Sequence, residues 1–355
     1  MGEIGESFIG LTYKPTDVVS EGGLIVFRSS NIQNGCMDYK DIVRVNKNVK
    51  EKLITKKDDL LVCARNGSAR LIGKNAILHE IDANQTFGAF MMVFRSDINH
   101  FVHQLLNTRR YSSQVSENLG ARINQITSSD LSSFEFFFPK GNSEMNKIAA
   151  LLDLLDERIA TQNKIIDKLQ SLIKGISSKI FASIKGVEYR MGDIATITNG
   201  NSNVQDAITE AKDGLYPFFD RSEDIKYLPT FLFDKEAIIY PGEGADFMPR
   251  YFKGKFALHQ RCYAIFDFNE IINAQFLYFY LRTKNSYFIR NAVGSTVPSL
   301  RLDTFQKLKV VIPSKNTQHS VSLCLSCIEQ KCYLENEILQ TLLKQKQFLL
   351  RQMFI

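Results

Sequence analysis

The feature that most constrains how this chain folds is an internal duplication that runs through its 355 residues. Residues 1–4 read Met-Gly-Glu-Ile, and residues 191–194 read Met-Gly-Asp-Ile. Residues 136–139 (Phe-Phe-Phe-Pro) end the first copy, as residues 310–313 (Val-Val-Ile-Pro) end the second. Because these weak matches come in the same order in both halves, they predict one domain written twice.

The middle of each copy predicts matched strands joined by loops of different length. Residues 61–63 and then 65–67 of the first copy match residues 238–240 and then 243–244 of the second. The separation between matched residues changes along the chain, so the loops inside the repeat differ in length. Loops carry binding functions more often than the elements they connect, which indicates that the two copies bind different things.

Each copy is followed by a long segment with the apolar spacing of a coiled-coil helix. In residues 143–185 and 315–355, apolar side chains recur at alternating intervals of four and three, as in the seam of a left-handed coiled coil. Polar side chains interrupt the seam at a matching place in both segments. Its central residues are Leu155, Ile159, Gln162 and Ile166 in the first segment and Ile328, Cys332, Glu335 and Leu339 in the second.

These two helices need partners for their seams. A helix of about 35 residues is roughly 50 Å long, and a domain of this size cannot bury a seam of that length. We expect the helices to pair antiparallel as a spacer, because the second copy lies between them and brings the chain back. Gln162 and Glu335 are then expected near a pseudo-twofold axis, facing each other or the same neighbours, as a polar layer that fixes the register. The alternative is that each helix is an ordinary core helix.

The patterns predict four parts: a first head (1–142), a first spacer helix (143–185), a second head (186–314) and a second spacer helix (315–355). Apolar residues make up 44% of the chain and charged residues 23%, which is typical of folded domains. The net charge of +6 permits a nucleic-acid partner without requiring one. No apolar run approaches the ~20 residues of a membrane span, no secretory signal opens the chain, and six irregularly spaced cysteines suit reduced thiols. We therefore expect a cytoplasmic protein with no membrane partner.

No motif of the sequence assembles a catalytic, nucleotide or metal site. Residues 67–75 resemble a phosphate-binding loop, but five residues separate the glycines where four are required, and Asn75 replaces the Ser or Thr that holds magnesium. A hairpin turn with a basic tip is expected there instead. Cys324, Cys327 and Cys332 have no second Cys or His pair at zinc spacing, so we expect them to pack on a helix. The sequence therefore offers no assembled active site.

Both heads carry loop residues of the types that recognise bases. Arg, Asn and Gln pair with base edges through two hydrogen bonds, and a carboxylate accepts from the amine of cytosine. Plain turn chemistry is the alternative for many of these positions. The different polar sets suit a reader of two different short sequences. The candidates are Arg28, Ser29, Ser30, Asn31, Gln33, Arg65, Asn66, Arg70, Lys74, Arg122 and Asn124 in the first head, and Arg221, Ser222, Glu243, Arg250, Tyr251, Lys253, Lys255, Arg261, Thr296 and Arg301 in the second.

The order of these elements resembles the specificity (S) subunit of type I restriction–modification systems. The likeness rests on the tandem heads, both long helices, the Gly192-Asp193-Ile194 element, residues 294–301 (Gly-Ser-Thr-Val-Pro-Ser-Leu-Arg) and the exit through residues 310–313 into the second helix. It covers essentially the whole chain. One departure is that Met1 stands directly before Gly2, whereas residues 186–190 precede the second copy. Either the first head lacks an edge strand or the chain is shortened.

The resemblance implies α/β heads with twisted sheets, which act as target-recognition domains and read the two halves of a bipartite site in double-stranded DNA. It implies that the helices set the unread spacer and dock two modification (M) subunits, which carry S-adenosylmethionine and methylate adenines. Restriction (R) subunits join in the full complex. The chain itself is then a non-catalytic subunit and holds no cofactor. The alternative function is a structural adaptor whose helices dimerise and whose heads bind protein.

Overall fold

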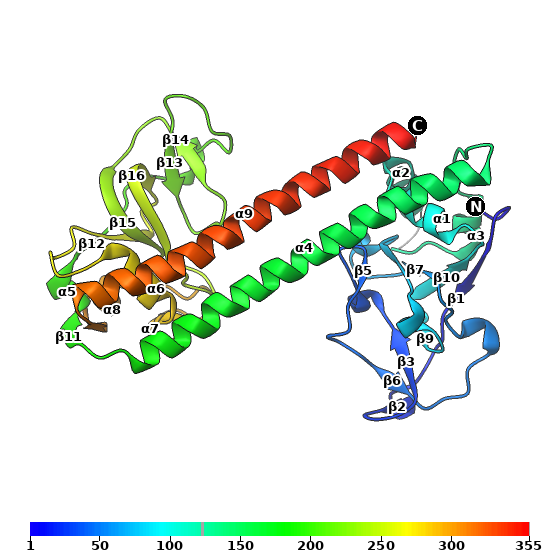
Figure 1. The fold of residues 1–355 in the computed structure, drawn as a ribbon, viewed down its shortest axis with the longest axis horizontal. Coiled ribbons are helices and arrows are strands. Elements are labelled where there is room, and N and C mark those ends of the chain that lie inside the picture. The colour runs from blue at the N-terminus through cyan, green and yellow to red at the C-terminus, as the bar shows by residue number, and fades with distance from the viewer. Residues whose placement is uncertain (122–123, 355) are drawn as a thin grey trace. The chain divides into compact units, whose positions relative to one another are not determined.

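The computed structural model describes residues 1–121 and 124–354 of the chain (Figure 1). The chain divides into two compact units, Met1–Lys164 with Glu337–Ile355 and Ile165–Asn336. The long helices α4 (Asn142–Ser183) and α9 (Lys315–Met353) each contribute one half to each unit. Each unit therefore combines one head with two half-helices. None of the helices in the described ranges has a stretch long and apolar enough to cross a lipid bilayer.

The first unit contains two small sheets and three short helices. One sheet has the order β1 (Glu6–Ile9), β10 (Met91–Arg95), β7 (Leu60–Cys63), β8 (Asn75–Ile77), and all its neighbours are antiparallel. The other has the order β2 (Val18–Val19), β6 (Arg44–Val45), β3 (Leu24–Phe27), β9 (Thr86–Phe87), with β3 and β9 parallel. The hairpin β4 (Ile32–Gln33) and β5 (Cys36–Met37) and the helices α1 (Asn99–Leu105), α2 (Arg109–Ala121) and α3 (Ser128–Ser133) complete the head. Its 3-10 helices are η1 (Pro15–Asp17), η2 (Ser29–Asn31), η3 (Glu51–Leu53), η4 (Ala69–Leu71) and η5 (Glu80–Asp82).

The second unit joins the corresponding strands into one sheet of six. Its order is β12 (Thr196–Asn199), β17 (Cys262–Phe266), β15 (Phe233–Pro241), β16 (Arg250–Leu258), β13 (Tyr216–Phe219), β14 (Lys226–Leu228). Only β13 and β16 are parallel neighbours in this sheet. The strands β11 (Val187–Arg190) and β18 (Lys309–Ile312) form a separate antiparallel pair. The helices are α5 (Met191–Ile194), α6 (Ala274–Arg282), α7 (Asn285–Asn291) and α8 (Leu302–Gln306), with η6 at Val204–Asp206.

The duplication predicted from the sequence is confirmed by matching backbone hydrogen bonds. The amino group of Met1 donates to the carbonyl of Phe134 at 2.7 Å, and the amide of Met191 donates to the carbonyl of Leu308 at 2.9 Å. The glycine that follows each methionine packs against the short helix α3 or α8, where a Cβ would lie 3.1 to 3.2 Å from a side-chain carbon. The repeated Met-Gly element therefore closes both heads in the same way.

One match within the repeat was wrong by one residue. Met91 pairs with Cys63 in the first unit, and Cys262 pairs with Pro241 in the second. The same tight turn precedes β10 and β17, which aligns Met91 with Cys262. Cys63 therefore corresponds to Pro241, one residue beyond the sequence match of 238–240. Since a slip of one residue turns every side chain of a strand to the other face, the correction decides which residues are equivalent.

The described residues of the first head contain no counterpart of the strand pair β11 and β18. In the second unit, β18 pairs with β11, which precedes Met191. Residues 135–138, which correspond to β18, are described and form no strand. The phenylalanines of residues 134–138 pack inward or lie exposed instead, with Phe134 buried and Phe137 exposed.

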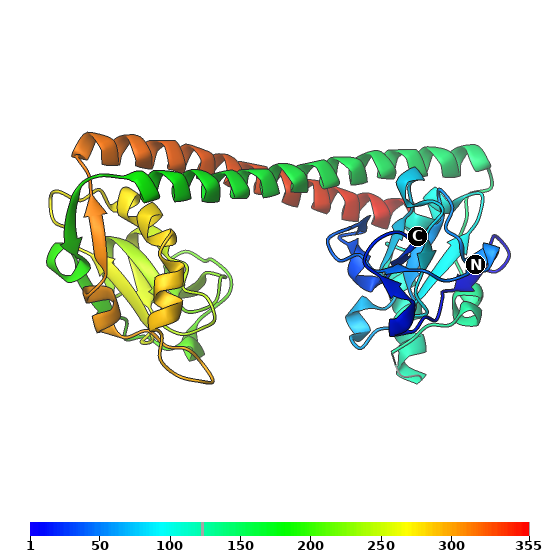
Figure 2. The same ribbon diagram turned by 90° about the horizontal axis from the view of Figure 1, so that it is seen from below.

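Aromatic packing ties the helix halves to the second head. Phe181 of α4 lies 5.6 Å from Phe276 and 5.3 Å from Tyr280, both on α6. Leu325 of α9 belongs to the same apolar cluster. Figure 2 shows α6 between the sheet of this unit and the two helix halves. Burial of such aromatic rings contributes more than their area alone suggests.

A polar cluster ties the helix halves to the first head. His100 of α1 contacts Asp153 of α4 at 2.5 Å, and Gln104 donates to Asp153 at 2.9 Å and to Asp156 at 3.0 Å. Lys346 of α9 forms an ion pair with Asp156. The second unit has Tyr278 and Arg282 of α6 on Glu329 of α9. Both heads thus hold their helices through a carboxylate.

The coiled-coil spacing correctly predicts which helix residues are buried. Leu155, Ile159, Gln162, Ile166, Cys332, Glu335 and Leu339 are buried and Ile328 is half-buried. The helix halves are antiparallel within the first unit, because Met145 lies near Phe354 while Asp156 lies near Lys346. Gln162 belongs to the first unit and Glu335 to the second, so their facing across a pseudo-twofold axis stays a prediction.

A close backbone approach makes Gly200 a test of the second head. A Cβ at this position would lie 2.0 Å from the carbonyl oxygen of Leu258. We expect Gly200→Ala to lower the free energy of unfolding by about 1–3 kcal/mol, because the backbone after β12 must shift away from the end of β16 to make room for the added methyl group. Gly175→Ala is the control, since its Cβ meets nothing within 4 Å on α4 and should gain about 0.5–1 kcal/mol. Urea unfolding measures both; equal stability of Gly200→Ala and the unchanged chain would contradict this packing.

The polar cluster predicts a pH dependence of the first unit. The hydrogen bond with Asp153 raises the pKa of His100 above its ordinary value near 6.5, while burial lowers the pKa of His103 to about 4. The contribution of the His100 ion pair is therefore complete below about pH 6.5 and is lost as the pH rises through the raised value. As the pH rises from about 6.5 through the raised pKa of His100, we expect the unfolding temperature of the unchanged chain to fall, and that of His100→Gln to fall less. If the two proteins lose stability in parallel, the ion pair of His100 with Asp153 does not contribute.

Candidate nucleic-acid interface

Three loops of the first head meet where β7 ends. The side-chain amide of Asn66 donates to the hydroxyl of Ser29 at 3.0 Å, and that of Asn124 donates to the carbonyl of Gly67 at 3.0 Å. The backbone amide of Asn66 also donates to the carbonyl of Asn124 at 3.4 Å. The structure thus brings together Ser29, Asn66 and Asn124, which the sequence proposed from separate segments. Arg122 lies outside the described residues.

Exposed cations lie on this junction. The guanidinium of Arg65 lies over the ring of Phe90, 5.3 Å from its centroid, and that ring is 58% exposed. Arg70 is exposed on η4, in the connection of the antiparallel pair β7 and β8. The predicted hairpin with a basic tip is therefore confirmed. Phe90 was missed by the sequence reasoning, because an isolated aromatic residue before a strand carries no signal of its own exposure.

The remaining candidates of the first head differ in how freely they face solvent. Arg28 forms an ion pair with Asp41 at 2.7 Å and keeps 34% of its side chain exposed. Gln33 is exposed, although its amide donates to the carbonyl of Ser30 at 3.1 Å. Lys74 donates to the carbonyl of Ile32 at 2.6 Å, and burial lowers the pKa of its amine. The ammonium group of Lys74 therefore holds a loop in place.

The prediction that Asn31 contacts DNA was wrong. Its side chain is fully buried, and its amide donates to the carbonyls of Asp38 and Asp41, each at 2.9 Å. Its carbonyl accepts from the backbone amide of Arg28 at 2.9 Å. Asn31 shapes the loop, because its side chain is buried and both donor hydrogens of its amide are used by backbone carbonyls.

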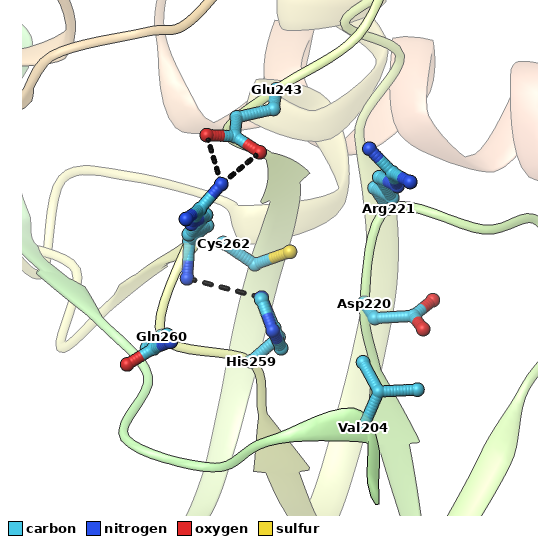
Figure 3. A pocket seen from close by; sticks show the side chains of 8 residues that line it. Val204, Asp220, Arg221, Glu243, His259, Gln260 and Cys262 are labelled. Carbon is cyan, nitrogen blue, oxygen red and sulfur yellow. Dashed lines mark hydrogen bonds and ion pairs between the residues drawn. The ribbon is translucent and has the colours of Figure 1, made fainter.

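In the second head, polar residues surround a hollow of about 290 Å³ (Figure 3). One guanidinium nitrogen of Arg261 donates to both carboxylate oxygens of Glu243, at 2.9 and 3.0 Å. The side chain of Arg261 is 62% exposed and that of Glu243 19%. The hollow therefore presents a donor and an acceptor side by side. Its lining is Val204, Asp220, Arg221, Glu243, His259, Gln260, Arg261 and Cys262.

The charges of this hollow are fixed by its surroundings. Burial alone would raise the pKa of Asp220, but hydrogen bonds from Lys226, at 2.6 Å, and from Ser222 outweigh it and lower that pKa. Burial lowers the pKa of His259, so its ring is neutral at pH 7. Asp220 is a buried anion with its own cation, whereas Arg221, next to it in Figure 3, is exposed.

The β16 candidates separate into internal and outward-facing residues. Arg250 donates to the carbonyl of Ser222, and the hydroxyl of Tyr251 donates to Glu236, so both are engaged within the head. Lys253 and Lys255 are exposed. Thr296 and Arg301 are also exposed, on the segment that leads to α8. Among the candidates of this head, the outward-facing cations are thus Lys253 and Lys255 on β16 and the exposed arginines Arg221, Arg261 and Arg301.

The described part of the chain holds no cluster of metal ligands beside these surfaces. Within residues 1–121 and 124–354, no group of three or more His, Cys, Asp or Glu side chains could hold a metal ion. Cys324 and Cys327 are exposed on α9 and Cys332 is buried there. Polar donors and acceptors on loop ends are suited to recognition.

The two copies of one α/β head, each followed by a long helix, define the class of the chain as a tandem-repeat α/β protein. The chain matches the family described as type I restriction modification DNA specificity domain over residues 1–171 and again over residues 185–344. It therefore belongs to this family, whose specificity subunits are not catalytic. Both matched segments contain a head and much of the helix that follows it.

Individual relatives support the same assignment. The chain is 30% identical over 132 residues to the type I restriction enzyme EcoDI specificity subunit of Escherichia coli, which is 37% of this chain and 29% of that protein. It is 28% identical over 173 residues to the EcoKI specificity subunit of Escherichia coli strain K12, which is 46% of this chain and 37% of that protein. The matches thus span about a third of these relatives. The crystal structure of a type I restriction–modification S subunit from M. genitalium has the same fold, with a TM-score of 0.70, 18% identity and coverage of 100% of this chain and 94% of that one.

The contrast between Asn31 and Gln33 gives a test of which loop residues are structural. We expect Asn31→Ala to lower the free energy of unfolding by about 1–3 kcal/mol, because it leaves buried backbone groups without partners. Gln33→Ala is the matched control from the same loop and should change it by less than about 0.5 kcal/mol. Thermal unfolding of the full chain measures both. If Asn31→Ala is as stable as Gln33→Ala, the loop does not depend on the buried amide.

Proposed function

We propose that this chain is the sequence-reading subunit of a type I restriction–modification complex, and that each head reads one half of a bipartite site in double-stranded DNA. The observation that supports the proposal most directly is that the two heads share one backbone arrangement but have different polar side chains on it. Arg65 and Arg70 face outward in the first head, whereas Glu243 and Arg261 line a hollow in the second. Two unlike surfaces on one frame suit two unlike half-sites.

The helices supply the second part of the proposal, which concerns the partners. Exposed apolar side chains lie on the half-helices of both units, where an isolated chain gains nothing from them. We propose that each unit docks one modification subunit there, and that the length of α4 and α9 sets the unread spacer. Two similar surfaces suit two copies of one partner. The exposed apolar residues are Leu151, Leu154 and Ile338 in the first unit and Leu172, Leu323 and Leu334 in the second.

The chemistry of the complex then lies in the partners. Modification subunits would hold S-adenosylmethionine and methylate adenines, and restriction subunits would join them to cleave unmodified DNA in the cytoplasm. This chain contributes the positions of two outward-facing sets of donors and acceptors. The exposed lysines and arginines beside them would hold the DNA backbone, because phosphate contacts position a protein without specifying sequence.

Exchange of one head tests the proposal. Residues 190–313 are replaced by the corresponding residues of a relative that recognises a different site, and the complex is assembled with the modification subunits encoded with this chain. We expect one half of the methylated site to change and the other half to remain, because the heads read independently. Sequencing of methylated adenines in the host genome measures both halves at once.

Two outcomes would contradict the proposal. A change in both halves, or in neither, would show that reading does not divide between the heads. An unchanged chain that supports no methylation and binds no DNA in complex with its partners would favour an adaptor that binds protein. The reverse exchange, of the first head only, is the control, since it should alter the other half of the site.

A further inference from the structure

The two heads share a hydrogen-bonded frame at the place where their polar residues differ. In the first head, the amide of Ile126 donates to the carbonyl of Ala64 at 2.8 Å, and in the second the amide of Leu300 donates to the carbonyl of Gly242 at 2.8 Å. The next residue of each strand end, Arg65 or Glu243, forms an isolated bridge to the residue before that amide. Arg65 and Glu243 are therefore equivalent positions.

The neighbouring position is fixed in the same way. Phe90 directly precedes Met91, and Arg261 directly precedes Cys262, and the tight turn before β10 and β17 is the same in both heads. Phe90 and Arg261 are therefore equivalent. In each head the two positions contact each other: Arg65 lies over the ring of Phe90, and Arg261 is paired with Glu243.

A second pair of equivalent positions shows the same reversal of charge. The amide of Gly88 donates to the carbonyl of Phe27 at 2.9 Å, and the amide of His259 donates to that of Phe219 at 2.9 Å. The residues that follow these phenylalanines are Arg28 and Asp220. Arg28 pairs with Asp41 and Asp220 pairs with Lys226. The charge is thus opposite in the two heads at both pairs of equivalent positions, Arg65 and Glu243, and Arg28 and Asp220.

We infer that the residue pair at positions 65 and 90 of the first head, and its counterpart at positions 243 and 261 of the second, is the base-reading pair of each head. This inference rests on the proposed function and names the positions and their chemistry. Arg65 donates to the two acceptors of guanine, O6 and N7, while the exposed ring of Phe90 offers an apolar contact to an adjacent thymine methyl group. Glu243, oriented by Arg261, accepts from the exocyclic amine of cytosine.

The reversal is informative because it excludes a uniform role for this position. A residue that contacts phosphate must be a donor in both heads, since every phosphate is an anion. The frame keeps a cation in the first head and a carboxylate in the second, and a carboxylate at the DNA surface repels the backbone unless it meets a base amine. In both heads the residue at this position contacts its neighbour at the equivalent place, Arg65 with Phe90 and Glu243 with Arg261. We therefore assign the same role, base reading, to both positions.

The test uses the full chain with its own modification subunits and reads the methylated site by sequencing. Arg65→Lys keeps the charge but loses the planar guanidinium that donates two parallel hydrogen bonds to guanine. One position of one half-site should therefore become degenerate, with the preference for guanine over other bases reduced about ten-fold or more. Glu243→Gln keeps the shape and adds a donor, so one position of the other half-site should shift from cytosine toward adenine. Each variant should leave the opposite half-site intact.

Matched controls and outcomes keep the inference separate from the proposed function. Arg109→Lys, at the exposed start of α2, and Glu210→Gln, 78% exposed, make the same two substitutions elsewhere on the heads and should leave the site unaltered. If Arg65→Lys leaves the base preference of the methylated site unchanged, the inference is overturned while the proposed function stands. The same holds if either variant weakens methylation equally at all sequences. If the unchanged chain directs no methylation to a bipartite site, the proposed function fails and the inference fails with it.

Discussion

The structure depends on two apolar seams that no single head can bury. Each seam runs along one long helix, α4 or α9, and each helix contributes one half to each unit. Apolar packing anchors both units: Phe181 packs against Phe276 and Tyr280 in the second, and Met145 joins the cluster of Phe101 in the first. Carboxylates of the helices add polar contacts in both units. Neither head is complete without the helix halves, because their core residues include side chains from α4 and α9.

Duplication then separates two tasks within the same domain. The backbone frame, closed by the Met-Gly element and by the bonds at the end of β7 and β15, is the same in both heads. The side chains carried on it differ in charge and in shape, as at Arg65 and Glu243. A recognition surface can change without loss of the fold when it lies on loop ends that the frame already holds. This division allows one backbone frame to carry two unlike sets of polar side chains.

Much of this architecture was predictable from the sequence, and the exceptions have physical reasons. The repeat order and the three–four spacing located both heads and the buried faces of both helices. The strand match near Cys63 was wrong by one residue, because apolar residues on both faces of a buried strand hide its register. Asn31 and Gln33 carry the same chemistry in the sequence, yet one is buried and one exposed. Only the fold of the loop distinguishes them. The exposure of Phe90 is likewise set by the tertiary fold and not by its sequence neighbours.

The central claim is that one frame, built twice, reads two different short sequences that lie at a fixed separation. It is tested most directly by sequencing the methylated adenines of a genome that expresses this chain with its modification subunits. The account predicts a single asymmetric motif, with two unlike specified halves and a constant number of unspecified base pairs between them. A continuous motif, a symmetric one, or a gap of variable length would contradict it.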